Sequence, residues 1–343
     1  MVDINQQIHL VSRPSGEAMA ENFKLVEAPM PEPAEGQVLI RHHFLSLDPY
    51  MRGRMNDAKS YAQPQPLDKV MQGGTVVASK HSRYAVGDTV VAFGGWQQYA
   101  LADGNQPSTL RKVDTAQVPL SAYLGAVGMP GVTAWYGLMK ICQPKPGQTI
   151  VVSAASGAVG SVVGQLAKTR GCRAVGIAGG VDKCRYVVEE LGFDACVDYK
   201  AHADSKALYQ ALKQATPDGV DGCFENVGGT VLDTTLLRMN AFGRIALCGM
   251  ISGYDGAPIP LQQPQLSRSS ARWSPRASSN TAKASRKVSR PRPKRSSACS
   301  RAATSASSSS SSSERTGDSM SDLILHHYPG SPFSEKVRLV LGM

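Results

Sequence analysis

The stretch from Thr149 to Arg170 constrains the fold more than any other part of the chain. Its first residues, TIVVS, are β-branched or apolar and predict a short strand buried on both faces. A glycine turn follows, and apolar residues then recur at helical spacing, at Val159, Val162, Val163 and Leu166. A strand, a tight glycine turn and a helix, in this order, are the setting of a dinucleotide-binding fingerprint.

The turn contains Gly157, Ala158, Val159 and Gly160. Gly157 would let the backbone approach a pyrophosphate, and Gly160 would let the helix pack closely on the strand. The free N–H groups of the first helical turn would bind the phosphate charge. Ala155 stands where the strict pattern has its first glycine. A glycine turn in some other α/β protein therefore remains the alternative.

The next predicted strand, 173–178, ends at Gly179 and Gly180. A site selective for NAD would carry Asp or Glu near this point, bonded to the ribose 2′-hydroxyl. The chain has glycine instead, with Lys183 and Arg185 just beyond. Cations without an acid suit the 2′-phosphate of NADP. The alternative is that both side chains are solvated residues of a helix.

Length and composition set wider bounds. The 343 residues suffice for two domains, and 42% of them are hydrophobic. The formal charge of +10 lies within residues 264–320, while residues 1–263 are balanced, so no specific nucleic-acid partner is expected. Seven scattered cysteines without a CxxC motif predict buried thiols in a reducing compartment. Neither an apolar signal region nor a membrane-spanning run is found, so we expect a cytoplasmic protein without membrane contact.

The order of elements predicts an α/β protein with two kinds of sheet. Short strands separated by Gly and Pro indicate a small barrel-like β domain; they are expected at 4–11, 23–27, 37–47, 73–79, 86–91 and 96–101. Asp48 is predicted to cap a helix that has Pro49 at its first position, and a second helix is expected at 131–142. Strands and helices then alternate, which predicts a doubly wound parallel sheet. Its strands are expected at 149–153, 173–178, 195–198, 220–225 and 244–248, with helices starting near 158, 182, 205 and 230.

Several motifs resemble one known family. They are SLDPYMRGRM at 46–55, the GTVVAS and VGDTVVAF pair within 74–93, GMPGVTAWYGL at 128–138, SAASGAVGSVVGQLAK at 153–168, GIAGGVDKCRYVVEELGFDACVDYK at 176–200, DGCFENVGG at 221–229 and GRIALCGMISGY at 243–254. Together they resemble the zinc-independent medium-chain dehydrogenase/reductases, in the branch of prostaglandin reductases, 2-alkenal reductases and bacterial curcumin reductase-like enzymes. The resemblance covers residues 1 to about 263. It implies a GroES-like β-barrel domain at 1–127 and a Rossmann NADP-binding domain at 128–263.

The resemblance also implies roles for single residues. It places the pyrophosphate at Gly157 to Gly160 and the 2′-phosphate near Lys183 and Tyr199. It places the nicotinamide beside Asn226 and the Cys248–Tyr254 stretch, which brings in Cys248, Gly249, Ile251 and Ser252. Tyr254 matches a tyrosine proposed to bond the substrate carbonyl or to help protonate the product, and Tyr50 lies near the substrate.

No metal site is expected. Catalytic zinc in related alcohol dehydrogenases needs a thiolate from the first domain, and no cysteine precedes Cys142. The neighbouring His42 and His43 are predicted to be one packed and one solvated histidine rather than ligands.

The implied function is NADPH-dependent reduction of the C=C bond of α,β-unsaturated aldehydes and ketones, with hydride transfer to the β-carbon. A quinone reductase of the same superfamily is one alternative. A remnant without catalytic activity is another, because members of the family continue with a further Rossmann strand, which also forms a dimer edge. Homodimers are typical of the family and doubtful for this chain.

After residue 263 the character of the sequence changes. Residues 264–319 are rich in Ser and Arg and cannot bury a core, so a disordered tail is expected there. Residues 320–343 resemble the start of a glutathione S-transferase. A frameshift near residue 263 would explain both segments, and a genuine basic tail that binds nucleic acid or an acidic partner is the alternative.

Overall fold

The computed structural model describes residues 4–58, 63–78, 84–106 and 110–256. The predicted tail, the glutathione S-transferase-like segment and the position of the inferred frameshift all lie outside these residues. The described part contains three sheets: one of three strands and two of five strands each. It contains no helix long and apolar enough to cross a membrane.

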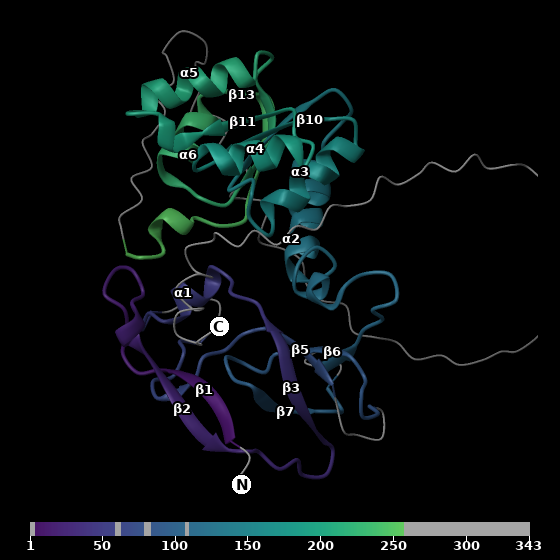
Figure 1. The fold of residues 1–343 in the computed structure, drawn as a ribbon. Coiled ribbons are helices and arrows are strands. Elements are labelled where there is room, and N and C mark those ends of the chain that lie inside the picture. The colour runs from purple at the N-terminus through teal and green to yellow at the C-terminus, as the bar shows by residue number, and fades with distance from the viewer. Residues whose placement is uncertain (1–3, 59–62, 79–83, 107–109, 257–343) are drawn as a thin grey trace, which may run out of the picture. The chain divides into compact units, whose positions relative to one another are not determined.

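The first two sheets are antiparallel and form the predicted β domain (Figure 1, purple to blue). The smaller one has the order β2-β1-β4, with bounds β1 Ile4–Leu10, β2 Phe23–Pro29 and β4 Lys69–Val70. The larger one has the order β7-β3-β5-β6-β8, with bounds β3 Gln37–Leu45, β5 Thr75–Ala78, β6 Val90–Ala92, β7 Tyr99–Asp103 and β8 Leu110–Lys112. The smaller sheet buries Ile8 and Leu10 against Met51, Met55 and Trp96.

The third sheet is parallel and has the order β11-β10-β9-β12-β13 (Figure 1, teal to green). Its bounds are β9 Thr149–Ser153, β10 Arg173–Ala178, β11 Ala195–Asp198, β12 Val220–Glu225 and β13 Met239–Leu247. All five residues of β9 are buried at the centre of the sheet. This is the predicted doubly wound Rossmann sheet, and its strand order reverses between β9 and β12. In open sheets of this kind ligands bind in the crevice beyond the strand ends at that point.

Helices pack on the sheet in two apolar clusters. The bounds are α2 Met129–Tyr136, a π-helix η3 Gly137–Cys142, α3 Gly160–Thr169, α4 Val181–Glu189, α5 Ser205–Ala215 and α6 Gly229–Leu236. One cluster joins Leu138, Val163 and Phe193 to the buried Phe224 of β12. The other joins Leu208 and Leu212 of α5 to Val151, Val175 and Val231.

Several predicted boundaries were wrong. Asp48 does not cap a helix: α1 spans Tyr50–Arg54 with Pro49 at its cap, and the Asp48 carboxylate accepts a hydrogen bond from the Ser46 hydroxyl (3.0 Å). The strand predicted at 86–91 begins only at Val90, because Gly87 forms a turn at φ +95°. The strand predicted at 96–101 begins at Tyr99, because Trp96 turns inward and stacks on Phe23.

The later helices also differ from the prediction at their ends. The helix predicted at 131–142 is α2 followed by a π-helical turn. A Cβ atom at Gly137 would lie 2.4 Å from the Phe224 ring, so this turn passes close over the sheet. Helix α3 starts at Gly160 rather than near 158.

Strand β13 starts earlier than predicted and is irregular. Val220 of β12 pairs with Met239, whereas Gly222 already pairs with Arg244, so residues 240–243 form an inserted bend. Phe242 lies in this bend at φ +64° with a fully exposed side chain. Only Arg244 to Leu247 pair regularly with β12, which is the part that the sequence pattern predicted. Within the described residues β13 is an edge strand of the sheet.

Candidate active site

The turn after β9 is shaped by close backbone packing. A Cβ atom at Gly160 would lie 2.3 Å from the Ala154 carbonyl oxygen, so only glycine lets α3 start at this point. Ala155 is fully buried, and its methyl group would lie 2.8 Å from a Cβ atom at Gly176 of β10. Because Gly176 has no side chain, there is room for Ala155, which replaces the first glycine of the strict fingerprint. Gly157 and Ala158 stay accessible at the tip of the turn.

A second glycine-containing segment, Gly179 and Gly180, follows β10. A Cβ atom at Gly179 would lie 2.8 Å from the Tyr199 ring, which is 40% exposed, so the ring lies directly against this glycine. Gly180 adopts φ +102° and donates its N–H to the Asp198 carboxylate (2.7 Å). The structure thus places Tyr199, which the resemblance assigns to the 2′-phosphate, against the end of β10. Lys183 follows in the first turn of α4, with a partly buried side chain.

Arg185 has a different environment from that predicted for a phosphate ligand. Its guanidinium pairs with Asp182 of the same helix (2.8 Å), and both side chains are well exposed. This arrangement matches the alternative interpretation, a solvated residue on a helix. A surface pair of this kind contributes little to stability.

Asn226 joins the ends of three strands. Its side-chain amide donates to the Ser153 carbonyl oxygen of β9 (2.8 Å), and its backbone N–H donates to the Ser153 hydroxyl (2.7 Å). Its own carbonyl oxygen accepts the N–H of Ile251 (3.1 Å), in the 3₁₀ turn η5 Ile251–Gly253 that follows β13. The predicted nicotinamide-side residue therefore lies at the reversal of strand order between β9 and β12.

Glu225, which the sequence analysis missed, organises the same point from inside. Its side chain is completely buried, and Oε1 accepts hydrogen bonds from the Ser153 hydroxyl (2.8 Å) and from the N–H groups of Val227 (2.6 Å) and Gly228 (2.8 Å). Burial raises the pKa of the Glu225 carboxyl, while the hydrogen bonds from Gly228, Val227, Ser153 and Asn226 act in the opposite direction. The available signal was an acidic residue directly after the apolar Cys223 and Phe224, at the end of the predicted strand.

The stretch after β13 packs against this loop. The N–H groups of Cys248 (2.9 Å) and Gly249 (3.1 Å) donate to the Glu225 carbonyl oxygen, and the Ser252 hydroxyl donates to the Val227 carbonyl oxygen (2.6 Å). A Cβ atom at Gly249 would lie 3.2 Å from both the Asn226 carbonyl oxygen and the Tyr254 hydroxyl. The structure therefore brings together the predicted residues Asn226, Gly249 and Tyr254, with Cys248, Ile251 and Ser252 beside them in the same stretch.

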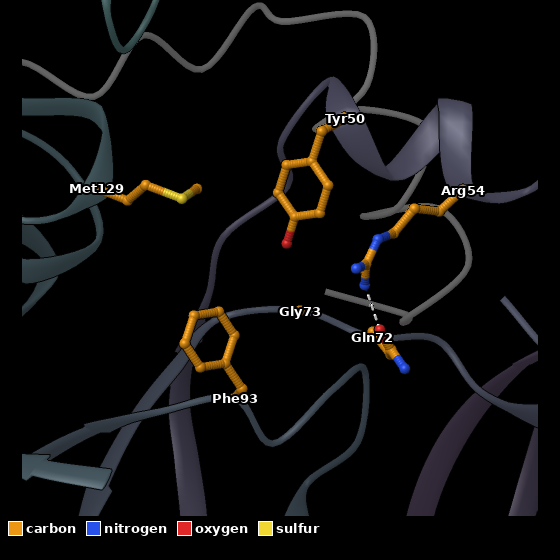
Figure 2. Close-up of a pocket in the computed structure, with 6 residues that line it drawn as sticks. All are labelled: Tyr50, Arg54, Gln72, Gly73, Phe93 and Met129. Atoms are coloured by element: carbon orange, nitrogen blue, oxygen red, sulfur yellow. Dashed lines mark hydrogen bonds between the residues drawn. The ribbon is translucent and has the colours of Figure 1, made fainter. Parts of the chain in front are cut away.

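The predicted substrate residue Tyr50 lines a separate pocket of about 470 Å³. A pocket of this size suits a small organic molecule. Its lining residues are Tyr50, Arg54, Gln72, Gly73, Phe93 and Met129, and Figure 2 shows the Tyr50 hydroxyl directed into the space between them. Tyr254 is not among these lining residues. The two predicted catalytic tyrosines therefore do not share this pocket.

An ion pair between a buried arginine and a partly exposed carboxylate connects the segments that carry the two tyrosines. Arg52 of α1 has a side chain only 3% exposed, and its Nε lies 3.0 Å from the carboxylate of Asp255, the residue after Tyr254. The same guanidinium donates to the Asn56 side chain (2.7 Å) and to the Gly16 carbonyl oxygen. Because the Arg52 charge is buried, losing the Asp255 carboxylate would leave that charge without its acidic partner, so this contact ties α1 to the Tyr254 turn.

The two histidines lie as predicted. His42 is partly buried and bonds the Gln97 carbonyl oxygen through Nδ1, whereas His43 is exposed. Among the residues that the structure describes, no group of three or more His, Cys, Asp or Glu side chains is placed to hold a metal ion.

Comparisons with known proteins match both the antiparallel part and the parallel sheet of the structure. Residues 6–110 match a family model described as the N-terminal domain of oxidoreductase, and residues 158–289 match one described as zinc-binding dehydrogenase. The NADPH-dependent curcumin reductase of Escherichia coli is 48% identical over 259 residues, which cover 75% of this chain and 73% of the relative. Prostaglandin reductase 1 of Rattus norvegicus is 46% identical over 236 residues, covering 68% and 69%.

A solved structure is similar to this chain in both sequence and fold. The crystal structure of CurA from Vibrio vulnificus in complex with NADPH is 47% identical to this chain, covers 76% of each chain and has a TM-score of 0.70.

The hydrogen bonds to Glu225 predict a large effect of removing its carboxylate. Glu225→Ala leaves three buried donors without their acceptor, and each such loss costs about 1–3 kcal/mol. We expect the free energy of unfolding, measured by urea titration, to fall by at least about 3 kcal/mol. Glu225→Gln is the matched control, because it keeps one acceptor oxygen and should lose much less.

The pH dependence of the free energy of unfolding also distinguishes the wild type from the Glu225→Gln variant. Because the folded pKa of Glu225 lies above its ordinary value of 4.5, the wild-type carboxyl contributes stability below pH 4.5 that is lost as the pH rises through the folded pKa. The amide of the Glu225→Gln variant does not titrate, so the stability of the wild type relative to this variant should decrease as the pH rises above 4.5. A difference that stays constant over this range would contradict the assigned direction of the pKa shift.

Proposed function

Because the chain belongs to the zinc-independent medium-chain dehydrogenase/reductases, we propose that it reduces the C=C bond of α,β-unsaturated aldehydes and ketones with NADPH. The observation that carries this proposal is the likeness to oxidoreductases named NADPH-dependent curcumin reductase, prostaglandin reductase 1 and NADP-dependent 2-alkenal reductase, each matched over about three-quarters or more than two-thirds of its length. A small unsaturated carbonyl compound is accordingly its partner molecule.

The fit of the cofactor is supported by the glycine-lined path across the strand ends. Gly157, Ala158, Val159 and Gly160 would hold the pyrophosphate, because Gly157 and Gly160 have no side chain to block a ligand and the turn lies at the positive, N-terminal end of α3. Tyr199, which lies against Gly179, and Lys183, in the first turn of α4, would hold the 2′-phosphate. Asn226, Cys248, Gly249, Ile251 and Ser252 would line the nicotinamide side.

NADPH, when bound, supplies the hydride that the β-carbon of the enone receives. The chain's own groups then have to stabilise the negative charge that develops on the carbonyl oxygen as an enolate forms. A hydroxyl donor aimed at this oxygen is worth most in the transition state. We assign that donor to Tyr254, whose hydroxyl lies beside Gly249 at the proposed nicotinamide side, and we assign the binding of the substrate body to Tyr50 in its pocket.

We also propose that the protein works in the cytoplasm. Six described cysteines are free thiols, and Cys142, Cys172 and Cys223 among them are buried. Unpaired buried thiols are typical of a reducing compartment.

The proposed 2′-phosphate site predicts an effect of Lys183 on cofactor choice. The wild type should bind NADPH more tightly than NADH, and Lys183→Ala should narrow the ratio of the two dissociation constants by about tenfold, because one charge-assisted contact is lost. Arg185→Ala is the control, since its guanidinium already pairs with Asp182. Titration calorimetry measures both constants, and an unchanged ratio in Lys183→Ala would remove Lys183 from the site.

The proposed role of Tyr254 predicts a specific change in the kinetics of enal reduction. NADPH oxidation with a 2-alkenal should exceed that with a quinone. Tyr254→Phe should then lower kcat by about 10²-fold or more with little change in KM, because the lost donor acts on developing charge. Tyr209→Phe, in α5, serves as the control and should keep the wild-type kcat. A Tyr254→Phe protein with nearly normal kcat would transfer the role to Tyr50 or to water, and activity with quinones alone would contradict the proposed reaction.

A further inference from the structure

The pocket around Tyr50 has two chemically different sides. Tyr50, Phe93 and the Met129 thioether supply aromatic and apolar surface, while the Arg54 guanidinium lies on the other side, next to Gln72 (Figure 2). Tyr50 and Arg54 are four residues apart on α1, and this spacing places both side chains on one face of the helix. The pocket thus combines an apolar wall with a single permanent positive charge.

The hydrogen-bonding capacity of Arg54 is only partly used. One Nη donates to the Gln72 side chain, and the guanidinium carbon lies 5.7 Å from the centre of the Tyr50 ring. Among the described residues, the buried Nε finds no hydrogen-bond partner, and no acidic side chain lies within ion-pair distance of Arg54. A guanidinium has five donors, and a buried donor without a partner costs free energy.

Arg52, two residues earlier on the same helix, provides an internal comparison. It is more deeply buried, yet it has a carboxylate, an amide and a carbonyl oxygen as acceptors. The difference follows from direction: Arg52 points into the protein, whereas Arg54 points into the pocket. The charge of Arg52 is matched by the chain itself, and that of Arg54 is left for a ligand.

We infer that the pocket selects enones that carry a carboxylate at the end remote from the C=C bond, and that Arg54 binds this carboxylate. This inference rests on the proposed function, since it names a substrate class for the same site. A planar guanidinium matches a carboxylate with two parallel hydrogen bonds, which a Lys side chain cannot reproduce. The apolar wall formed by Tyr50, Phe93 and Met129 contacts the carbon skeleton between the two ends of the substrate.

Two enones that differ only in the carboxylate test the inference. They are 4-phenyl-3-buten-2-one and 4-(4-carboxyphenyl)-3-buten-2-one. The dissociation constant of each is measured by titration calorimetry on the full 343-residue chain, and kcat/KM is measured by NADPH oxidation. The wild type should bind the carboxylated enone about tenfold more tightly, the effect of one charge-assisted pair in a partly open pocket.

Variants assign this preference to Arg54. Arg54→Gln should abolish the preference, and Arg54→Lys should keep a reduced part of it, because the charge remains and the paired geometry is lost. Arg41→Gln, an exposed arginine of β3, is the matched control and should leave the preference intact. Circular dichroism and thermal unfolding verify that each variant is folded; if Arg54→Gln is not, Arg54→Lys decides.

The outcomes separate the inference from the proposed function. If neither enone supports NADPH oxidation but the carboxylated one binds more tightly through Arg54, the reductase function fails and the anionic subsite stands. If both enones are reduced and bind equally well to the wild type, the function stands and the inference is overturned. A preference that persists unchanged in Arg54→Gln also overturns it, because the carboxylate then binds elsewhere.

Discussion

The carboxylate of Glu225 and the hydroxyl of Ser153 meet inside the parallel sheet, where the order of its strands reverses. One oxygen of Glu225 accepts three hydrogen bonds, and its backbone carbonyl accepts two more from the stretch after β13. The ends of β9, β12 and β13 are thereby fixed to one another by a fully buried group. A buried polar network of this kind is stabilising only when each member is satisfied, which makes the geometry around Asn226 and Gly249 rigid.

This rigidity matters for hydride transfer because the cofactor and the substrate must be held within a narrow range of positions. The glycines of the site remove side chains where a nucleotide would lie, and the hydrogen bonds to Glu225 hold two further glycines, Gly228 and Gly249, in place. Helix α1 contributes in two ways. Its Arg52 is bound to Asp255, next to Tyr254, while its Tyr50 and Arg54 face the pocket. One short helix therefore carries both a structural ion pair and side chains that line the pocket.

The sequence pattern predicted the parallel sheet well because its strands are continuous apolar runs, and runs such as TIVVS have few alternatives. It also located the glycine turn, since Gly160 is needed for a steric reason that acts locally. The antiparallel part was harder: β4 and β8 are two and three residues long, too short for periodicity, and both were missed. The bend before Arg244 places Phe242 in a left-handed conformation, which nothing in its neighbourhood of the sequence indicates.

The contacts that define the site were the least predictable. Arg52 and Asp255 are 203 positions apart, and Ser153 and Glu225 are 72 apart, so no local pattern reports either pair. The family resemblance supplied Tyr50, Tyr254 and Asn226 but was silent on the groups that hold them. Only the packing of the strand ends shows that the buried Glu225, next to Asn226, is bonded to β9 and to the stretch after β13.

The position of the transferred hydride tests the central claim most directly. An enone is reduced with NADPH that carries deuterium at the transferable position of nicotinamide C4, and the product is analysed by NMR. The account predicts a saturated ketone with deuterium on the former β-carbon. An alcohol with deuterium on the carbonyl carbon, or a product without deuterium, would contradict it.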